Sequence, residues 1–269
     1  GKAEAGIQYD DEIEQAFELA KYTFGLVNDN DSIMSLGDAA LRLSTVEGGR
    51  SQYWFDRALE TYGGNEARMI FAGDTALHNA VKFPENAKYW LDRALEIYGH
   101  NEEKLFFAAD TALTNAKNSS ENARYWFDCA LNIYAGNESR MKSVVMTVLR
   151  DAEAFPGDVQ YWFNRGVEIC QSTNYSEGLE YAFDIASKMA ERDVSSARPW
   201  LEKCMEIVTD RRMPDDSRIQ QLADLMLSTI ASGGDVRSSD ISRILEYLES
   251  SKGSDAVSIF TYLEREIKD

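Results

Sequence analysis

The feature that most constrains this chain is a tryptophan that returns at a fixed interval. Trp54, Trp90, Trp126 and Trp162 are 36 residues apart, and Trp200 follows after 38. The text around them repeats as well, as in YWFDRALETYGGNEARM, YWLDRALEIYGHNEEKL and YWFDCALNIYAGNESRM. Such self-similarity is typical of repeat proteins, in which each unit buries its apolar face only by stacking on its neighbours.

A second short motif lies between the tryptophan blocks. It reads GDAAL from Gly37, GDTAL from Gly73 and ADTAL from Ala109, again 36 residues apart. In both parts of the unit the apolar residues recur at intervals of three and four, as along YWLDRALEIYG, which places them on one face of a helix. Each repeat is therefore predicted to be a pair of antiparallel helices.

Capping residues mark where these helices should begin and end. Gly99 is expected to stop the helix that contains Trp90, because glycine tolerates the left-handed conformation at a helix end. Three asparagines, each followed by glutamate, are predicted to be the N-caps of the second helices: Asn65, Asn101 and Asn137. Prolines are expected in turns, at Pro84 and Pro156, and in a first helical turn, at Pro199.

Extended along the chain, the pattern predicts an all-α solenoid of about seven antiparallel helical hairpins, or about fourteen helices. We expect a single helical-repeat domain over residues 1–269. Residues 10–52 form its N-terminal hairpin, with a first helix at residues 11–26, and residues 53–210 form the regular repeats of 36–38 residues. Three divergent helices at residues 211–269 should cap the array, since terminal repeats need a polar outer face.

The small residues in these helices resemble those of tetratricopeptide repeats (TPRs). That family places a small residue in one helix against a small-x-x-x-large-x-x-small stretch in the other. The first role falls to Gly37, Gly73 and Ala109. The stretch occurs at Ala87, Leu91 and Ala94 and at Ala123, Phe127 and Ala130, with degraded versions at Val159, Phe163 and Gly166 and at Ala197, Leu201 and Cys204.

The resemblance covers residues from about 10 to 210 and implies a right-handed α-solenoid. It departs from the family in length, because the usual unit is two residues shorter. The surplus falls in the turn that joins the two helices, as in KNSSEN from Lys117. A HEAT-like or Sel1-like solenoid would satisfy the same spacing.

The composition restricts the partners and the compartment. The chain has 46 acidic and 28 basic residues, a formal charge of −18, which should repel nucleic acids and anionic membranes. No apolar run approaches the roughly 20 residues that span a bilayer. The three cysteines, Cys129, Cys170 and Cys204, suggest neither a disulfide framework nor a zinc site, so a cytoplasmic protein without metal or cofactor is expected. The numbering begins at Gly1 rather than at a methionine, so removal of a leader or of a preceding domain stays open.

The five tryptophans are interpreted as the core between hairpins rather than as an aromatic ladder for a sugar or peptide, because a tryptophan at helical spacing buries a large apolar area. A row of aspartates is harder to interpret. It comprises Asp38, Asp74 and Asp110, one per repeat, and is resumed by Asp184.

The resemblance implies that the helix with this row lines a concave groove. The row would then be an acidic stripe, with Ile70 and Phe106 one turn before two of its members, and would suit a basic or amphipathic peptide. Alternatively, each aspartate accepts hydrogen bonds from Asn79, Asn115 or an arginine of an adjacent repeat and so fixes the register of the repeats. A second acidic row, Asp56, Asp92 and Asp128, is expected to pair with arginines between repeats.

Three functions are consistent with these patterns. The first is a scaffold or adaptor that binds a basic or amphipathic segment of another protein in its groove. The second is a structural subunit or self-assembling domain, hence a possible homo-oligomer. The third is an α/α-barrel hydrolase or lyase. We expect no enzyme, because His78 and His100 are the only histidines, and neither a phosphate-binding loop nor an HExxH motif occurs.

Overall fold

The computed structural model describes residues 2–46, 50–118, 122–155, 157–210, 216–251 and 261. Over these residues the chain forms 13 α-helices and three short 3₁₀-helices and contains no strand. The all-α prediction is therefore confirmed for this part of the chain. The helix expected last, after residue 251, and the turn position Pro156 lie outside the described residues.

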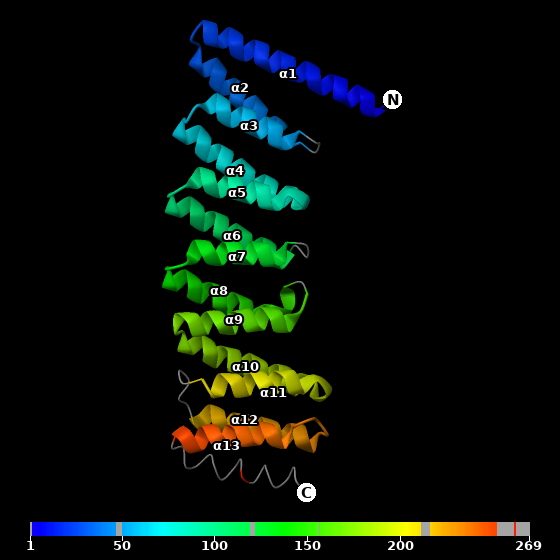
Figure 1. The fold of residues 1–269 in the computed structure, drawn as a ribbon, viewed down its shortest axis with the longest axis vertical. Coiled ribbons are helices and arrows are strands. Elements are labelled where there is room, and N and C mark those ends of the chain that lie inside the picture. Colours follow the sequence, from blue (N-terminus) through cyan, green and yellow to red (C-terminus); the bar gives the residue numbers. More distant parts are fainter. Residues whose placement is uncertain are drawn as a thin grey trace. The chain divides into compact units, whose positions relative to one another are not determined.

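The chain divides into two compact units, residues 1–133 and 134–269. The single-domain expectation over residues 1–269 therefore stays a prediction. The first unit holds α1 (Lys2–Leu26), α2 (Asn30–Leu43), α3 (Ser51–Tyr62), α4 (Glu66–Lys82), η1 (Pro84–Asn86), α5 (Ala87–Tyr98), α6 (Glu102–Asn118) and α7 (Ala123–Tyr134), the last of which ends at the boundary (Figure 1). The second unit holds α8 (Glu138–Arg150), η2 (Ala152–Ala154), α9 (Val159–Thr173), α10 (Ser176–Arg192), η3 (Val194–Ser196), α11 (Ala197–Val208), α12 (Asp216–Ala231) and α13 (Ser238–Ser251).

Two kinds of helix alternate along each unit. The tryptophans lie on α3, α5, α7, α9 and α11, which we call the Trp helices, and α2, α4, α6, α8, α10 and α12 are the intervening helices. Inside the first unit α2 packs mainly on α3 and α4 on α5, and inside the second α8 packs on α9 and α10 on α11. These four intervening helices thus each have their main contact with the Trp helix that follows them.

The predicted helix ends are confirmed. The side-chain oxygens of Asn65, Asn101 and Asn137 accept hydrogen bonds from backbone N–H groups three residues later, at 3.2, 3.1 and 3.1 Å. Gly99 follows α5 with φ of 54°, in the left-handed region where side chains are strained. One boundary differs from expectation, because α1 begins at Lys2 rather than near residue 11.

All five tryptophans are buried, with at most 7% of each residue exposed. Several pack edge-on against a phenylalanine of an earlier helix. The ring centroids are 5.2 Å apart for Phe55 and Trp90 in the first unit and 5.2 Å for Phe163 and Trp200 in the second. Aromatic pairs in this geometry add stability beyond the area that they bury. The large residue of one Trp helix therefore contacts the tryptophan of the next.

The glycines of the GDAAL and GDTAL motifs face a tyrosine ring of the following Trp helix. A Cβ atom added at Gly73 would lie 2.6 Å from Cε1 of Tyr98, and one added at Gly37 would lie 2.6 Å from Cε1 of Tyr62. Real Cβ contacts are almost never this short, so the two helices can approach as they do only because these positions lack a side chain.

Substitution of Gly73 by alanine is therefore expected to destabilise the protein. The methyl group must push the Tyr98 ring out of its position, which should lower the free energy of unfolding by about 1–3 kcal/mol. Urea unfolding followed by circular dichroism measures the difference. Gly25→Ala is the matched control, because nothing lies within 4 Å of its added Cβ, and alanine should be neutral or stabilising in a helix. Equal loss of stability in both variants would contradict the close-approach argument.

Candidate binding surface

The predicted aspartate row lies on the intervening helices, and its members are occupied by internal contacts. Asp38 on α2 accepts a hydrogen bond from the Tyr62 hydroxyl at 2.9 Å and pairs with Arg68 of α4 at 2.6 Å. Asp74 on α4 repeats this arrangement: the Tyr98 hydroxyl donates at 2.7 Å and Lys104 of α6 pairs at 2.8 Å. We call this set of contacts the Asp–Tyr–cation lock.

The rest of the row fits this description in part. In the second unit Asp184 of α10 pairs with Arg218 of α12. Asp110 is exposed, and Tyr134 and Arg140 stand at the same spacings after it but belong to the other unit. An arginine of an adjacent repeat was one of the predicted partners, and the structure has it at Asp38 and Asp184.

The predicted asparagine donors are wrong. The side-chain amide of Asn79 donates instead to the backbone oxygen of Ser44, the C-cap residue that follows α2, at 3.1 Å. Asn115 donates to the backbone oxygen of Thr111 in its own helix, at 2.9 Å. Both amides point away from the aspartates because they lie more than one helical turn further along and on another side of the helix.

A second set of contacts links successive Trp helices. The Tyr125 hydroxyl donates to Asp92 at 2.9 Å, and Arg93 pairs with Asp56 at 3.1 Å. The predicted pairing of the second acidic row between repeats is confirmed at Asp56 and Arg93. At the start of the chain Glu14 accepts from Tyr53, and this hydrogen bond lowers the pKa of the carboxyl below its usual value.

A pocket of about 270 Å³ lies between α2 and α4, next to the first lock. Its apolar wall includes Phe71, of which 54% is exposed. The guanidinium of Arg42 also lines it and makes no hydrogen bond or ion pair with any residue that the structure describes. Thr45, another lining residue, accepts a hydrogen bond at its backbone oxygen from Lys82 at 2.5 Å.

The exposed phenylalanine recurs one repeat later. Phe107 of α6 is also 54% exposed, and the ammonium of Lys104 lies 5.9 Å from its ring centroid. The sequence had pointed instead to Ile70 and Phe106, which are only partly exposed. One position along a helix rotates a side chain by about 100°, so the neighbouring residues carry the exposed rings. The 36-residue spacing could not separate the two pairs, because Ile70 and Phe106 share it with Phe71 and Phe107.

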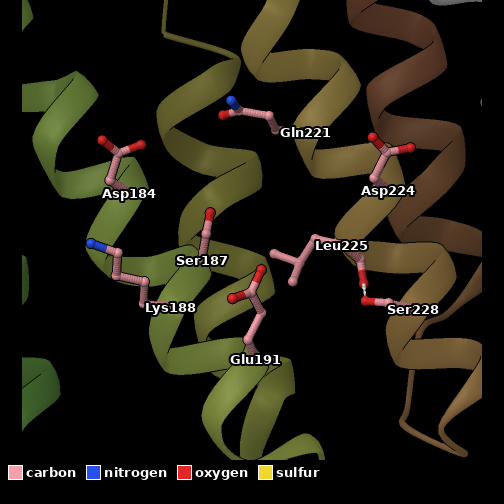
Figure 2. Close-up of a pocket in the computed structure, with 8 residues that line it drawn as sticks. All are labelled: Asp184, Ser187, Lys188, Glu191, Gln221, Asp224, Leu225 and Ser228. Carbon is pink, nitrogen blue, oxygen red and sulfur yellow. Dashed lines mark hydrogen bonds between the residues drawn. The ribbon is translucent and has the colours of Figure 1, made fainter.

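The second unit has a pocket in an equivalent place, between α10 and α12, with a volume of about 530 Å³. Figure 2 shows the two helices facing each other across it. The side chains of α10 stand at the same offsets from the aspartate as those of α2 in the first pocket: Asp184, Ser187, Lys188 and Glu191 correspond to Asp38, Leu41, Arg42 and Thr45. This second pocket is more polar, because α12 adds Gln221, Asp224 and Ser228.

Chemically reactive groups are few in this part of the chain. Among the described residues no cluster of His, Cys, Asp or Glu could hold a metal ion. Burial raises the pKa of the Cys204 thiol to about 12 and also raises that of Cys129, so neither is a ready nucleophile. His78 and His100 are both exposed. No helix among these residues is both long and apolar enough to cross a membrane.

The comparisons with known proteins returned nothing. No protein-family model, no curated protein and no solved structure matches the chain at a significant level. The surface must therefore be interpreted from its own geometry.

The locks predict a loss of stability at alkaline pH. Burial raises the pKa of Tyr62 and of Tyr98, and the neighbouring aspartates raise it further. An unfolded tyrosine releases its proton near pH 10, whereas these buried hydroxyls keep theirs. The stability that these two tyrosines contribute should therefore be fully present below about pH 10. It should fall as the pH rises above this value, because the unfolded state then binds fewer protons than the folded state.

Urea unfolding at about pH 8 and about pH 10.5 measures this effect. The double variant Tyr62→Phe, Tyr98→Phe should lose less stability between the two pH values than the parent. Tyr22→Phe, at a residue that is 67% exposed, is the control and should behave as the parent does. An unchanged pH dependence in the double variant would contradict the assignment.

Proposed function

We propose that this protein is a TPR-like helical-repeat scaffold, whose intervening helices together bind a segment of another protein. Support for a continuous right-handed solenoid comes from the 36-residue period and from the glycines at Gly37 and Gly73, which take a tyrosine ring of the following helix. A repeated close contact of this kind places successive intervening helices at a constant offset. A constant offset produces a regular surface.

The observation that carries the binding proposal is the pair of exposed rings on α4 and α6. Phe71 and Phe107 stand one repeat apart, are equally exposed, and each lies beside a cation that is already paired with an aspartate. Large exposed aromatic residues in register are the usual anchors of protein–protein interfaces. A bound segment with apolar side chains at matching intervals would cover both rings.

The aspartates have a different role in this proposal from an acidic stripe. Arg68 and Lys104 already offset the charges of Asp38 and Asp74, so these carboxylates position the surface instead of attracting a ligand. The net charge of −18 still favours a basic or amphipathic segment at long range, where it increases the rate of encounter. Apolar contacts with the rings then supply most of the affinity. A cytoplasmic location, without cofactor or metal, belongs to the same proposal.

The test is affinity capture from native extract with three proteins. They are the parent, the double variant Phe71→Ser, Phe107→Ser, and the single variant Val81→Ser. Val81 is the matched control, because it is an exposed apolar residue at the other end of α4. The free energies of unfolding of the three proteins should differ by no more than about 0.5 kcal/mol per substitution, since these side chains are exposed. A partner held by the parent and by Val81→Ser should be lost by the double variant, with its affinity reduced about 30-fold or more. Retention by all three would place binding elsewhere.

A second candidate, a self-assembling subunit, is favoured by one observation on α1. Leu19, Tyr22 and Leu26 lie on one side of this helix and are each exposed by 65% or more. On the other side of α1, Phe17 is buried and packs edge-on against Trp54, as Phe55 of α3 packs against Trp90. The side of α1 opposite Phe17 is thus both apolar and exposed, and a second copy of the chain could cover it.

Light scattering over a concentration series distinguishes this candidate from the first. Self-assembly through α1 would be supported if the parent is a dimer and the double variant Leu19→Lys, Leu26→Lys is a monomer. A parent that stays monomeric at every concentration would exclude it and leave the scaffold proposal unaffected.

A further inference from the structure

The second unit contains a third pocket, which shares Lys188 but no other lining residue with the pocket between α10 and α12. It has a volume of about 230 Å³ and lies among α8, η2, α9, α10 and α11. Its walls are mainly apolar and are formed by Leu149, Phe163, Ile185, Met189 and Trp200. A pocket of this composition suits the hydrocarbon part of a small ligand.

The pocket lies where the repeat loses its regularity. In the first unit α4 extends to Lys82, but α8 ends at Arg150, four residues short of the equivalent position. The chain then passes into η2, and Arg150, Ala152 and Glu153 line the pocket at this break. A regular last turn of α8 is missing at the point where the cavity opens. The cavity is therefore a local departure from the repeat rather than a feature of every unit.

The polar rim of the pocket carries an unbalanced positive charge. Arg150 is paired with Asp151 at 2.8 Å, and Arg192 is paired with Glu153. Lys188 also lines the pocket, and its ammonium makes no hydrogen bond or ion pair with any of the described residues. Figure 2 shows the Lys188 side chain extending away from α12, hence away from the carboxylate of Asp224 across the other pocket.

We propose that this pocket binds a small apolar anion, a monocarboxylate with a hydrocarbon or aromatic body. The apolar walls bury the body, which supplies most of the binding free energy, and the ammonium of Lys188 pairs with the carboxylate at the rim. One unpaired cation beside an apolar cavity matches one negative charge. A multiply charged phosphate or a fully polar ligand would leave the apolar walls uncovered.

The proposal is independent of the scaffold function. It concerns another ligand class and a pocket of the second unit, whereas the exposed rings Phe71 and Phe107 lie on α4 and α6 of the first unit. If the double variant Phe71→Ser, Phe107→Ser loses the protein partner, the anion-binding proposal is unaffected. If the chain does not bind the anion, the scaffold proposal is unaffected.

The experiment is isothermal titration calorimetry of the full chain with sodium octanoate. Sodium acetate, an anion that lacks the apolar body, is the control ligand. Octanoate should bind at one site per chain with a Kd in the millimolar range or tighter, and acetate should not bind. Fluorescence offers a second readout, because Trp200 lines the pocket. Absence of octanoate binding, or equal binding of acetate, would overturn the proposal.

Two variants and a control locate the site. Lys188→Met keeps the aliphatic stem and removes the charge, and should weaken octanoate binding about fivefold. Met189→Trp fills the cavity and should abolish binding while the thermal melt keeps its cooperativity. Lys203→Met is the matched control on α11, because Lys203 is paired with Glu206 outside the pocket, and it should bind octanoate as the parent does. Parent-like binding by Lys188→Met and Met189→Trp would show that octanoate binds elsewhere, and the proposed pocket would be rejected.

Discussion

A tyrosine ring packed on a glycine determines how closely neighbouring helices of the first unit approach. Tyr62 and Tyr98 each take the space that a Cβ atom would otherwise occupy, at Gly37 and Gly73. The hydroxyl of each ring then reaches an aspartate next to that glycine, and a cation from the following intervening helix closes the arrangement. Packing and charge pairing thus act at the same place. The exposed phenylalanines one turn after these cations depend on both.

Burial of the tryptophans adds a second contact, between successive Trp helices. Because Phe55 packs edge-on against Trp90, the core continues from one Trp helix to the next without a polar gap. The intervening helices can then leave one side in contact with solvent, which is where the two equivalent pockets occur. Departure from this regularity, as at the early end of α8, opens a cavity of a different, apolar kind.

Much of the local structure could be predicted from the sequence, because it depends on short-range patterns. The helices, the asparagine caps and the buried tryptophans follow from spacing alone. Contacts that depend on the rotation of a helix were harder to predict. Phe71 is exposed instead of Ile70 because one position changes the direction of a side chain by about 100°. The tyrosine partner of Asp74 was missed because it lies 24 residues away, on another helix.

The Asp–Tyr–cation lock joins residues that are all within 30 positions of each other along the chain. Each lock is therefore complete within less than the length of one 36-residue repeat and contains no residue from a distant part of the sequence. Deleting or duplicating one whole 36-residue unit would rejoin a glycine and aspartate to an equivalent tyrosine and cation. The contacts that hold neighbouring helices together at Asp38 and Asp74 thus depend on nearby sequence and not on the total length of the chain.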